Sequence, residues 1–235
     1  MKYTEYKHSS HEHILTLGNE KTQFKCDGCG EPGWGARYRC DDCNYDLHKE
    51  CTLASKTMYH PFYKKRHFQL LEQGAQGRYC DACGRDVLGF VYHCYETGYD
   101  LHPCCASLPL VLQGGGVELH LRDTLSENCG KCRTKRLWGN VRGWSYRSSD
   151  KECHYHVSCV KDIFVEKWER GYFGEEGMNN LAIEIANVPN LQVARQNGRS
   201  SSRFNKCLKI AKLVLNLIIS ILTGDPVGLV TFCFQ

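Results

Sequence analysis

The stretch that decides the fold is residues 26–51, which read CDGCGEPGWGARYRCDDCNYDLHKEC. It contains three close pairs of metal-binding side chains: Cys26 and Cys29, Cys40 and Cys43, and His48 and Cys51. A tetrahedral zinc site usually takes four thiolate or imidazole ligands as two close pairs from separated segments. The stretch therefore predicts zinc coordination as the organising feature of its fold.

The same pattern recurs twice downstream, with a period of roughly fifty residues, which marks a repeat architecture. The second repeat contains Cys80, Cys83, Cys94, His102 and Cys105, and the third contains Cys129, Cys132, His156 and Cys159. A histidine precedes each repeat, at His13, His67 and His120. Alternating apolar residues follow these histidines and predict short strands, and one short helix is expected after the last cysteine of each repeat.

Composition supports metal rather than an ordinary hydrophobic core. The 235 residues include 16 cysteines and 11 histidines, and every cysteine except Cys207 and Cys233 precedes residue 160. Small units with few aliphatic residues need disulfides or metals to fold. No apolar stretch resembling a secretory signal is visible at the N-terminus, so we expect an intracellular protein, in the cytoplasm or nucleus, whose cysteines bind metal.

The first repeat offers eight candidate ligands once His13 and a trailing His60 are included, which is enough for two complete sites. Consecutive pairing of the ligand pairs is one solution. An interleaved arrangement is the better one, because His13 and His60 frame the repeat from outside.

These residues resemble the plant divergent C-one domain family, the cysteine/histidine-rich relatives of the C-one zinc module of protein kinase C. The order of ligands from His13 to His60 matches throughout, and residues 89–94 and 99–105 look like the plant cysteine/histidine-rich subgroup. The resemblance implies small α+β modules with cross-braced zinc sites. It implies two interleaved sets in the first module: Cys26, Cys29, His48 and Cys51, and His13, Cys40, Cys43 and His60.

The later repeats depart from this pattern at the second site. Thr97 stands in the place of Cys43, and Ser148 and Lys151 stand where Cys40 and Cys43 would fall. One complete set remains in each: Cys80, Cys83, His102 and Cys105 in the second, and Cys129, Cys132, His156 and Cys159 in the third. His67 and Cys94 form a candidate partial site. We therefore predict about four structural Zn²⁺ ions, and we expect Cys104, Cys153 and His154 to be packing or surface residues.

Closed sets of four ligands predict structural rather than catalytic zinc, so no enzyme activity is expected. The resemblance implies a plant-type scaffold that binds other proteins in signalling or stress responses. Lipid recognition is the alternative, although the short segment 30–39 lacks the glutamine of diacylglycerol-binding relatives. Cys129 and Cys132 also have the spacing of a thiol-disulfide oxidoreductase, which we rank third because His156 and Cys159 complete a zinc set.

Charge is distributed unevenly along the chain. The net charge is +4, but six basic and no acidic residues lie between Ile185 and Gly224. The cysteine-rich repeats are close to neutral, so nucleic acid is not an expected partner. The basic segment precedes a strongly apolar helical pattern at 204–222, and we expect residues 195–235 to dock on protein or on an anionic membrane surface.

The predicted organisation has five parts. They are zinc modules at 8–62, 63–112 and 117–170, the last one degenerate, a linker at 171–203, and an amphipathic, apolar helical tail at 204–235.

Overall fold

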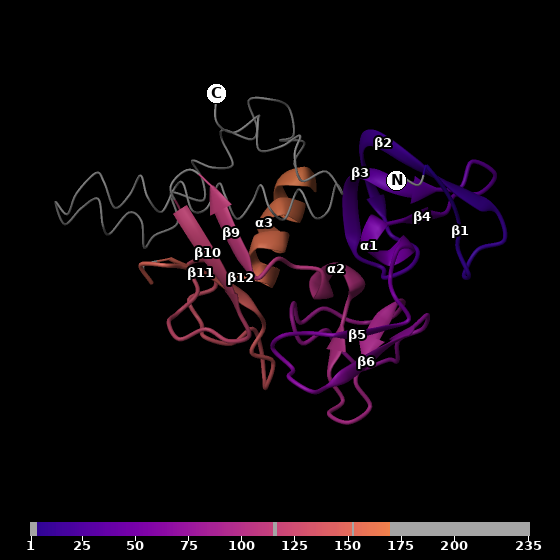
Figure 1. The fold of residues 1–235 in the computed structure, drawn as a ribbon. Coiled ribbons are helices and arrows are strands. Elements are labelled where there is room, and N and C mark those ends of the chain that lie inside the picture. The colour runs from indigo at the N-terminus through magenta and orange to yellow at the C-terminus, as the bar shows by residue number, and fades with distance from the viewer. Residues whose placement is uncertain (1–3, 115–116, 152, 170–235) are drawn as a thin grey trace. The chain divides into compact units, whose positions relative to one another are not determined.

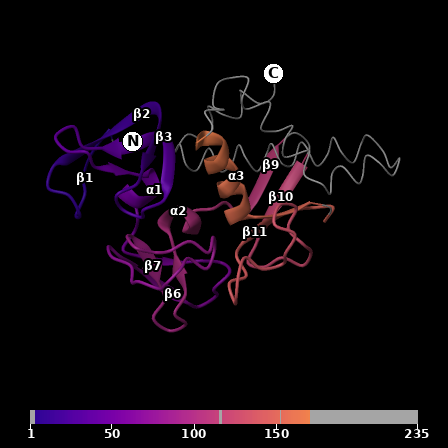
Figure 2. The ribbon, with the colours of Figure 1, turned by 180° about the vertical axis from the view of Figure 1, so that it is seen from behind.

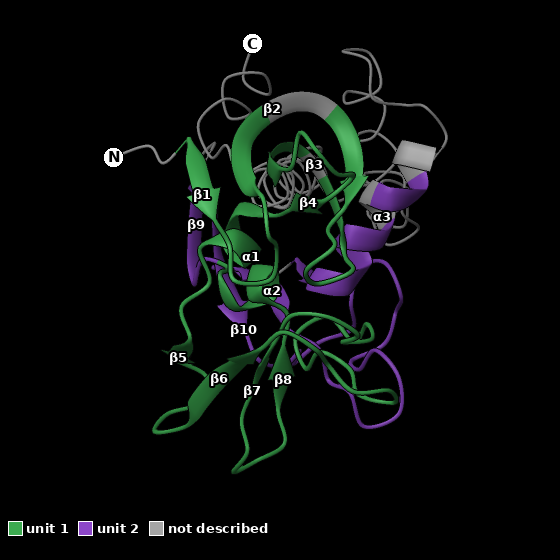
Figure 3. Cartoon of the chain, turned by 90° about the vertical axis from the view of Figure 1, so that its right-hand side faces the viewer, with its two compact units in different colours: residues 1–108, 219–229 green, residues 109–218, 230–235 purple. Residues whose placement is uncertain are grey.

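The computed structural model describes residues 4–114, 117–151 and 153–169. The expected linker at 171–203 and the helical tail at 204–235 lie outside the described residues. The described chain divides into two compact units, one ending at Leu108 and the other beginning at Pro109 (Figure 3).

The first unit opens with a four-stranded antiparallel sheet, in which consecutive strands are neighbours. Its elements are β1 (Glu5–Lys7), β2 (Ile14–Lys25), β3 (Pro32–Arg39), β4 (Asp46–Leu47) and the short helix α1 (Lys49–Thr52), labelled in Figure 1. We call residues 5–52 module 1. Alternation along β2 buries Leu15, and Tyr38 of β3 and Leu47 of β4 are buried as well.

The second sheet of this unit repeats the first in order and in the position of its helix. It consists of β5 (Thr57–Tyr59), β6 (His67–Leu71), β7 (Val91–His93), β8 (Asp100–Leu101) and α2 (Pro103–Ala106). We call residues 57–106 module 2. Tyr59 pairs with His67 across β5 and β6. The expected boundary between residues 62 and 63 therefore falls between two strands of one sheet.

The second unit contains a third meander of the same kind. Its elements are β9 (Val111–Gly114), β10 (Val117–Arg122), β11 (Ser145–Ser148), β12 (His154–His156) and α3 (Val157–Glu169), and Figure 2 shows this sheet beside α3 from behind. We call residues 111–169 module 3. Because β9 pairs with β10, the sheet begins before the expected start at residue 117.

The helices begin earlier than the sequence pattern indicated. In modules 1 and 2 the helix starts directly after the histidine and contains the last cysteine, Cys51 or Cys105, instead of following it. Within the described ranges, no helix combines the length and apolarity that crossing a membrane requires.

Modules 1 and 2 touch within the first unit through a backbone contact. The amide of Phe90 donates a 2.6 Å hydrogen bond to the carbonyl oxygen of Gly28, and the Phe90 ring stacks on His8 with 5.5 Å between ring centroids. A Cβ atom at Gly89 would lie 1.8 Å from that same carbonyl oxygen, so the approach requires glycine. Arg85 pairs with the buried Glu31 across the same contact.

Candidate metal centres

Four groups of metal-binding side chains form among the described residues, each with four donor atoms within 4.8 Å of one another. One such group is present in every module: Cys26, Cys29, His48 and Cys51; Cys80, Cys83, His102 and Cys105; and Cys129, Cys132, His156 and Cys159. We call these the first clusters. The structure thus brings together the residues that the spacing paired in each repeat.

The first two cysteines of each first cluster lie on a tight turn. Its closing hydrogen bond runs from the fifth residue to the carbonyl of the first cysteine, at 2.8 Å from Gly30 N to Cys26 O and 2.7 Å from Gly84 N to Cys80 O. Both glycines have positive φ, at 75° and 71°, which glycine adopts without steric cost. In module 3 the same position is Arg133, at φ 64°, so that turn carries backbone strain.

The histidine and the last cysteine come from the start of the helix. His48 is the residue before α1, and the amide of Cys51 bonds to its carbonyl at 3.0 Å. In all three modules the backbone amide of this histidine also donates a hydrogen bond to the sulfur of the first cysteine, with 3.4 Å between nitrogen and sulfur. The donor and acceptor pairs are His48 and Cys26, His102 and Cys80, and His156 and Cys129. This bond holds the histidine segment against the cysteine turn and stabilises a thiolate there.

The distances fit a tetrahedral zinc ion. Zn–S bonds near 2.3 Å and Zn–N bonds near 2.0–2.1 Å place two donors roughly 3.6 Å apart at a tetrahedral angle. The measured separation between a cysteine sulfur and Nδ1 of the histidine is 3.4 Å for Cys29 and His48 and 3.5 Å for Cys83 and His102. It is 3.3 Å for Cys132 and His156. The residues of each first cluster therefore fit Zn²⁺ in both donor chemistry and spacing.

The second nitrogen of each histidine ring orients the ligand. Nε2 of His48 lies 3.3 Å from the carbonyl oxygen of Pro32, and Nε2 of His102 lies 3.0 Å from that of Asp86. A proton on Nε2 donated to this carbonyl leaves the lone pair of Nδ1 for the metal. Nε2 of His156 is buried without a hydrogen-bond partner among the described residues, so the module 3 ligand lacks this support.

Proton affinities differ among the clustered thiols. Burial opposes ionisation of Cys26, but hydrogen bonds from Cys29 and Cys51 hold its pKa well below the usual value. A hydrogen bond from Cys159 is the main cause that lowers the pKa of Cys129 to about 3. In module 2, burial raises the pKa of Cys80. Zinc must displace protons from the remaining thiols, so its affinity falls as the solution becomes more acidic.

The fourth group is a second cluster in module 1, made of His11, His13, Cys40 and Cys43. Nδ1 of His13 lies 3.1 Å from the sulfur of Cys43 and 3.6 Å from that of Cys40. The ring of His11 stacks on Tyr45 with 4.2 Å between centroids. This cluster also fits zinc, and it is more exposed than the first cluster of the same module.

His60 does not join this cluster, which corrects the ligand set implied by the resemblance. It directly follows β5, whose partner strand β6 belongs to module 2. There it is buried beside Phe62 and Tyr63, and the Phe62 amide donates to its Nδ1 at 3.3 Å. The close pair of His11 and His13, two residues apart, was the available signal for the alternative ligand.

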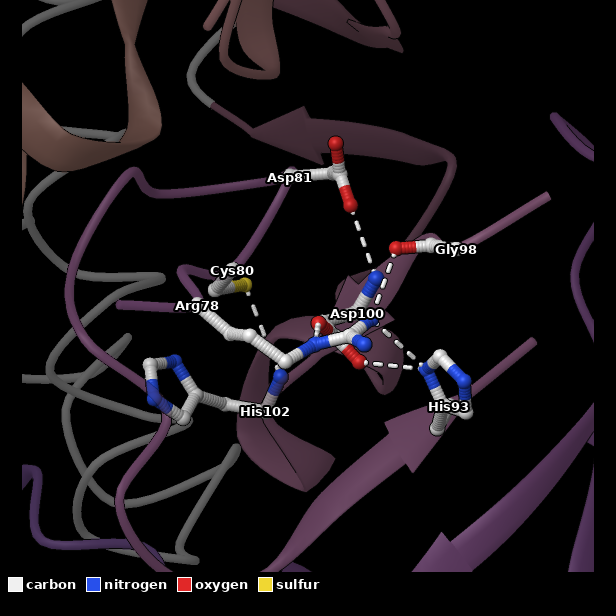
Figure 4. A network of polar contacts seen from close by, with 7 residues as sticks. All are labelled: Arg78, Cys80, Asp81, His93, Gly98, Asp100 and His102. Carbon is white, nitrogen blue, oxygen red and sulfur yellow. Dashed lines mark hydrogen bonds and ion pairs between the residues drawn. The ribbon is translucent and has the colours of Figure 1, made fainter. Parts of the chain in front are cut away.

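The candidate partial site of module 2 gathers no group of three or more metal-binding side chains in the described residues. The rings of His67 and Tyr59 contact each other with 5.4 Å between their centroids. Cys94 is buried in a turn that is closed by a hydrogen bond from the Gly98 amide to the Cys94 carbonyl oxygen. An arginine-centred network cross-links this region instead (Figure 4). Arg78 contacts Asp100 at 2.5 Å, Gly98 O at 2.8 Å and Nδ1 of His93 at 2.9 Å.

Module 3 has no cysteine pair at the place of the second site, where Ser148 and Lys151 stand instead. Ser148 donates to Asp150 at 2.5 Å and accepts from the Cys153 amide at 3.1 Å. Nε2 of His120 instead lies 2.6 Å from a carboxylate oxygen of Glu118. Cys104, Cys153 and His154 are all buried and belong to none of the four clusters.

Comparison with known proteins assigns the class of the N-terminal module. Residues 9–52 match the family model of the C1 domain, and this segment contains both clusters of module 1. It is a C1-type, cysteine/histidine-rich domain. The four clusters suit about four structural zinc ions.

One relative extends this comparison. The chain is 42% identical over 52 residues to "Probable nucleoredoxin 1" of Arabidopsis thaliana. The match spans 22% of this chain and 9% of that protein, so the chain covers less than a tenth of the relative's length. No solved structure matches the chain.

Proposed function

We propose that this chain is a zinc-stabilised, non-enzymatic adaptor of plant type that binds other proteins in intracellular signalling or stress responses. Four protein donors complete a tetrahedral zinc shell and leave no coordination position for a substrate. Metal in such sites contributes folding energy, and the function then resides in the surfaces that the folded modules present.

The observation that carries the proposal is an exposed tyrosine surface on module 2, which we define as Tyr59, Tyr95 and Tyr99. Their exposed fractions are 70%, 67% and 38%. All three lie at one end of the sheet, where β5 and β7 end and β6 and β8 begin. In module 1 the corresponding end carries His13 and Cys40 of the second cluster.

Contacts within the sheet hold these rings in place. The ring of Tyr59 contacts that of His67. The ring of Tyr95 lies 4.5 Å from that of His93, and the ring of Tyr99 lies 4.7 Å from that of Tyr63, measured between ring centroids. Exposed tyrosines offer a large apolar area and a polar end at low entropic cost, and they dominate many protein interfaces. The ion pair of Arg66 and Glu96 adds charge beside them.

A comparison of partners tests this surface. The tagged full-length chain and the variant Tyr59→Ser/Tyr95→Ser are each used to purify bound proteins from plant cells, and direct binding of a recovered protein is then measured with purified components. We expect the variant to lose binding by about 2 kcal/mol or more, because interface tyrosines act as hot spots. A matched control is Leu88→Ser, which alters another exposed apolar residue of module 2. Equal binding by all three proteins, with equal zinc content, would reject the proposal.

Lipid recognition is a second candidate function, and module 3 supplies the observation that favours it. Trp138 is 50% exposed at the tip of a tight hairpin, where it pairs with Val141 across a turn with Gly139 at φ 49°. Lys135, Arg136 and Arg142 lie exposed nearby in the sequence. An indole flanked by cations suits the surface of an anionic membrane, and residues 195–235 are proposed as a further contact.

Flotation with vesicles of phosphatidylserine and phosphatidylcholine tests this candidate. The full chain should float with anionic vesicles, and Trp138→Ser should reduce the bound fraction while Tyr95→Ser leaves it unchanged. Identical flotation of wild type and Trp138→Ser would remove the hairpin from the membrane hypothesis.

A further inference from the structure

Among the 14 described cysteines, Cys43 and Cys132 are the two that are exposed to solvent, and both belong to clusters. Cys43 shares its cluster with one further cysteine and two histidines, whereas Cys132 shares the first cluster of module 3 with two further cysteines and one histidine. Three thiolates outweigh the two positive charges of zinc, while two thiolates only balance them. The site around Cys132 therefore retains negative charge, which makes its exposed thiolate the stronger nucleophile.

The charged neighbours of the two exposed cysteines have opposite signs. Two acidic residues directly precede Cys43, namely Asp41 and Asp42. Four basic residues lie within four positions of Cys132: Lys131, Arg133, Lys135 and Arg136. Lys131 pairs with Glu166 of α3 at 2.9 Å, whereas the other three form no ion pair with any residue that the structure describes. An anionic reagent is therefore attracted to Cys132 and repelled from Cys43.

Hydrogen bonds fold this basic segment back around Cys132. The Cys129 amide donates to the carbonyl oxygen of Thr134 at 3.0 Å, and Oγ1 of Thr134 lies 3.1 Å from the sulfur of Cys132. The Thr134 hydroxyl donates its single proton to the carbonyl oxygen of Arg136 at 2.6 Å, so that proton does not shield the sulfur. The sulfur of Cys129, in contrast, accepts the His156 amide. Cys132 thus offers an open thiolate on a basic loop.

We propose that Cys132 is a modification site for an anionic low-molecular-weight disulfide, which forms a mixed disulfide with this residue and releases the zinc of module 3. The Cys132 thiolate attacks one sulfur of the reagent, and a new S–S bond forms between them. The original S–S bond breaks, and the other half of the reagent leaves as a thiolate. One thiolate is consumed and one is released, so the step needs no further oxidant.

Release of zinc follows because module 3 supports its remaining ligands poorly. A disulfide sulfur is neutral and a poor zinc ligand, so Cys129, His156 and Cys159 alone must hold the metal. Nε2 of His156 is buried without a hydrogen-bond partner in the described part of the chain, unlike the corresponding nitrogens of modules 1 and 2. The cysteine turn also places Arg133 at φ 64°, where the other two modules have glycine.

The test treats the zinc-loaded full chain with glutathione disulfide, which carries a net negative charge, or with the neutral hydroxyethyl disulfide. Zinc release is followed with a chromogenic chelator. Mass spectrometry after acid quenching and alkylation identifies the first cysteine to lose its thiol. With glutathione disulfide we expect that cysteine to be Cys132, with loss of one zinc ion.

A charge-reversed variant separates attraction of the reagent from reactivity of the thiolate. Lys135→Glu/Arg136→Glu changes two exposed side chains and keeps all zinc ligands. It should slow the reaction of Cys132 with glutathione disulfide about tenfold and leave the reaction with hydroxyethyl disulfide unchanged. Added salt should reduce the difference. The matched control Lys56→Glu/Lys64→Glu makes the same charge change at exposed positions of module 2 and should react like the wild type.

Three outcomes would overturn the proposal. One is a wild-type map in which Cys43 or any other cysteine reacts before Cys132, and this map does not depend on how the variants fold. Another is an equal effect of the charge reversal on both disulfides. The third is a mixed disulfide at Cys132 that leaves the zinc content unchanged. None of them affects the adaptor proposal, which is tested by partner binding under reducing conditions.

Discussion

At the scale of single residues, the identity of a ligand depends on which segment reaches the metal and not only on residue type. His11 and His60 are both histidines near the edges of module 1, yet His11 joins His13, Cys40 and Cys43 while His60 is buried in module 2. Either histidine fits a sequence pattern that requires only one histidine at the edge of the repeat.

Zinc stoichiometry separates these two histidines. His11→Ala should reduce the zinc bound to the full chain by one ion, because three ligands remain in the second cluster. His60→Ala should retain the wild-type stoichiometry. Elemental analysis of the purified proteins measures both. The reverse result would restore His60 as the ligand.

The buried imidazole of His60 should also make stability depend on pH. Burial lowers its pKa to about 4, below the usual 6.5, so the folded state favours the neutral ring. Above pH 6.5 the His60 ring is neutral in both the folded and the unfolded protein. Between pH 6.5 and 4, acid protonates this ring in the unfolded protein but not in the folded one, so the free energy of unfolding decreases. The free energy of unfolding is lower by about 1 kcal/mol near pH 5.5.

His60→Gln tests this dependence, because glutamine keeps a hydrogen-bond acceptor for the Phe62 amide but does not titrate. Denaturant unfolding of zinc-saturated protein is measured at pH 7.5 and at pH 5.5. We expect the difference between the two pH values to shrink in the variant by about 1 kcal/mol. An unchanged difference would show that His60 is not the group responsible.

At the scale of elements, the turns and short helices repeat closely, whereas the contacts between modules depend on particular glycines. The turn at Cys26 and the turn at Cys80 share the same hydrogen bond and the same left-handed glycine. Gly89 serves a different purpose, since it admits the carbonyl of Gly28 from another module.

Gly89→Ala should weaken the contact between modules 1 and 2. Its Cβ would lie 1.8 Å from the Gly28 oxygen, so the backbones must separate, at a cost of about 1–3 kcal/mol. Gly18→Ala in β2 is the matched control, because its Cβ meets only ordinary contact at 3.8 Å. Thermal unfolding of both zinc-loaded variants measures the effect. Equal melting temperatures would argue against the close packing of the two modules.

At the scale of the whole molecule, metal takes the place of a large hydrophobic core. Apart from the exposed Cys132, the first-cluster cysteines are buried, and each module adds a few large buried side chains, such as Tyr38, Phe68 and Trp144. Structural zinc contributes an apparent ~10–16 kcal/mol per site at neutral pH, which is comparable with the stability of an entire domain.

Removal of zinc should therefore unfold residues 4–169. A chelator added to the full chain should abolish the near-UV circular dichroism of the buried tyrosines and tryptophan, and readdition of zinc should restore it. Retention of that signal after complete loss of metal, shown by elemental analysis, would contradict the role of zinc as the main source of stability.

The sequence by itself determined the repeat, the three first clusters and the choice of zinc. Those features rest on spacings of three residues within turns and helix starts, which local chain geometry brings to one point. Only the tertiary structure decided that His11 replaces His60 and that β5 and β9 belong to the following sheets. Each of these depends on strand pairing or on packing between distant segments, and no local spacing encodes which segments meet.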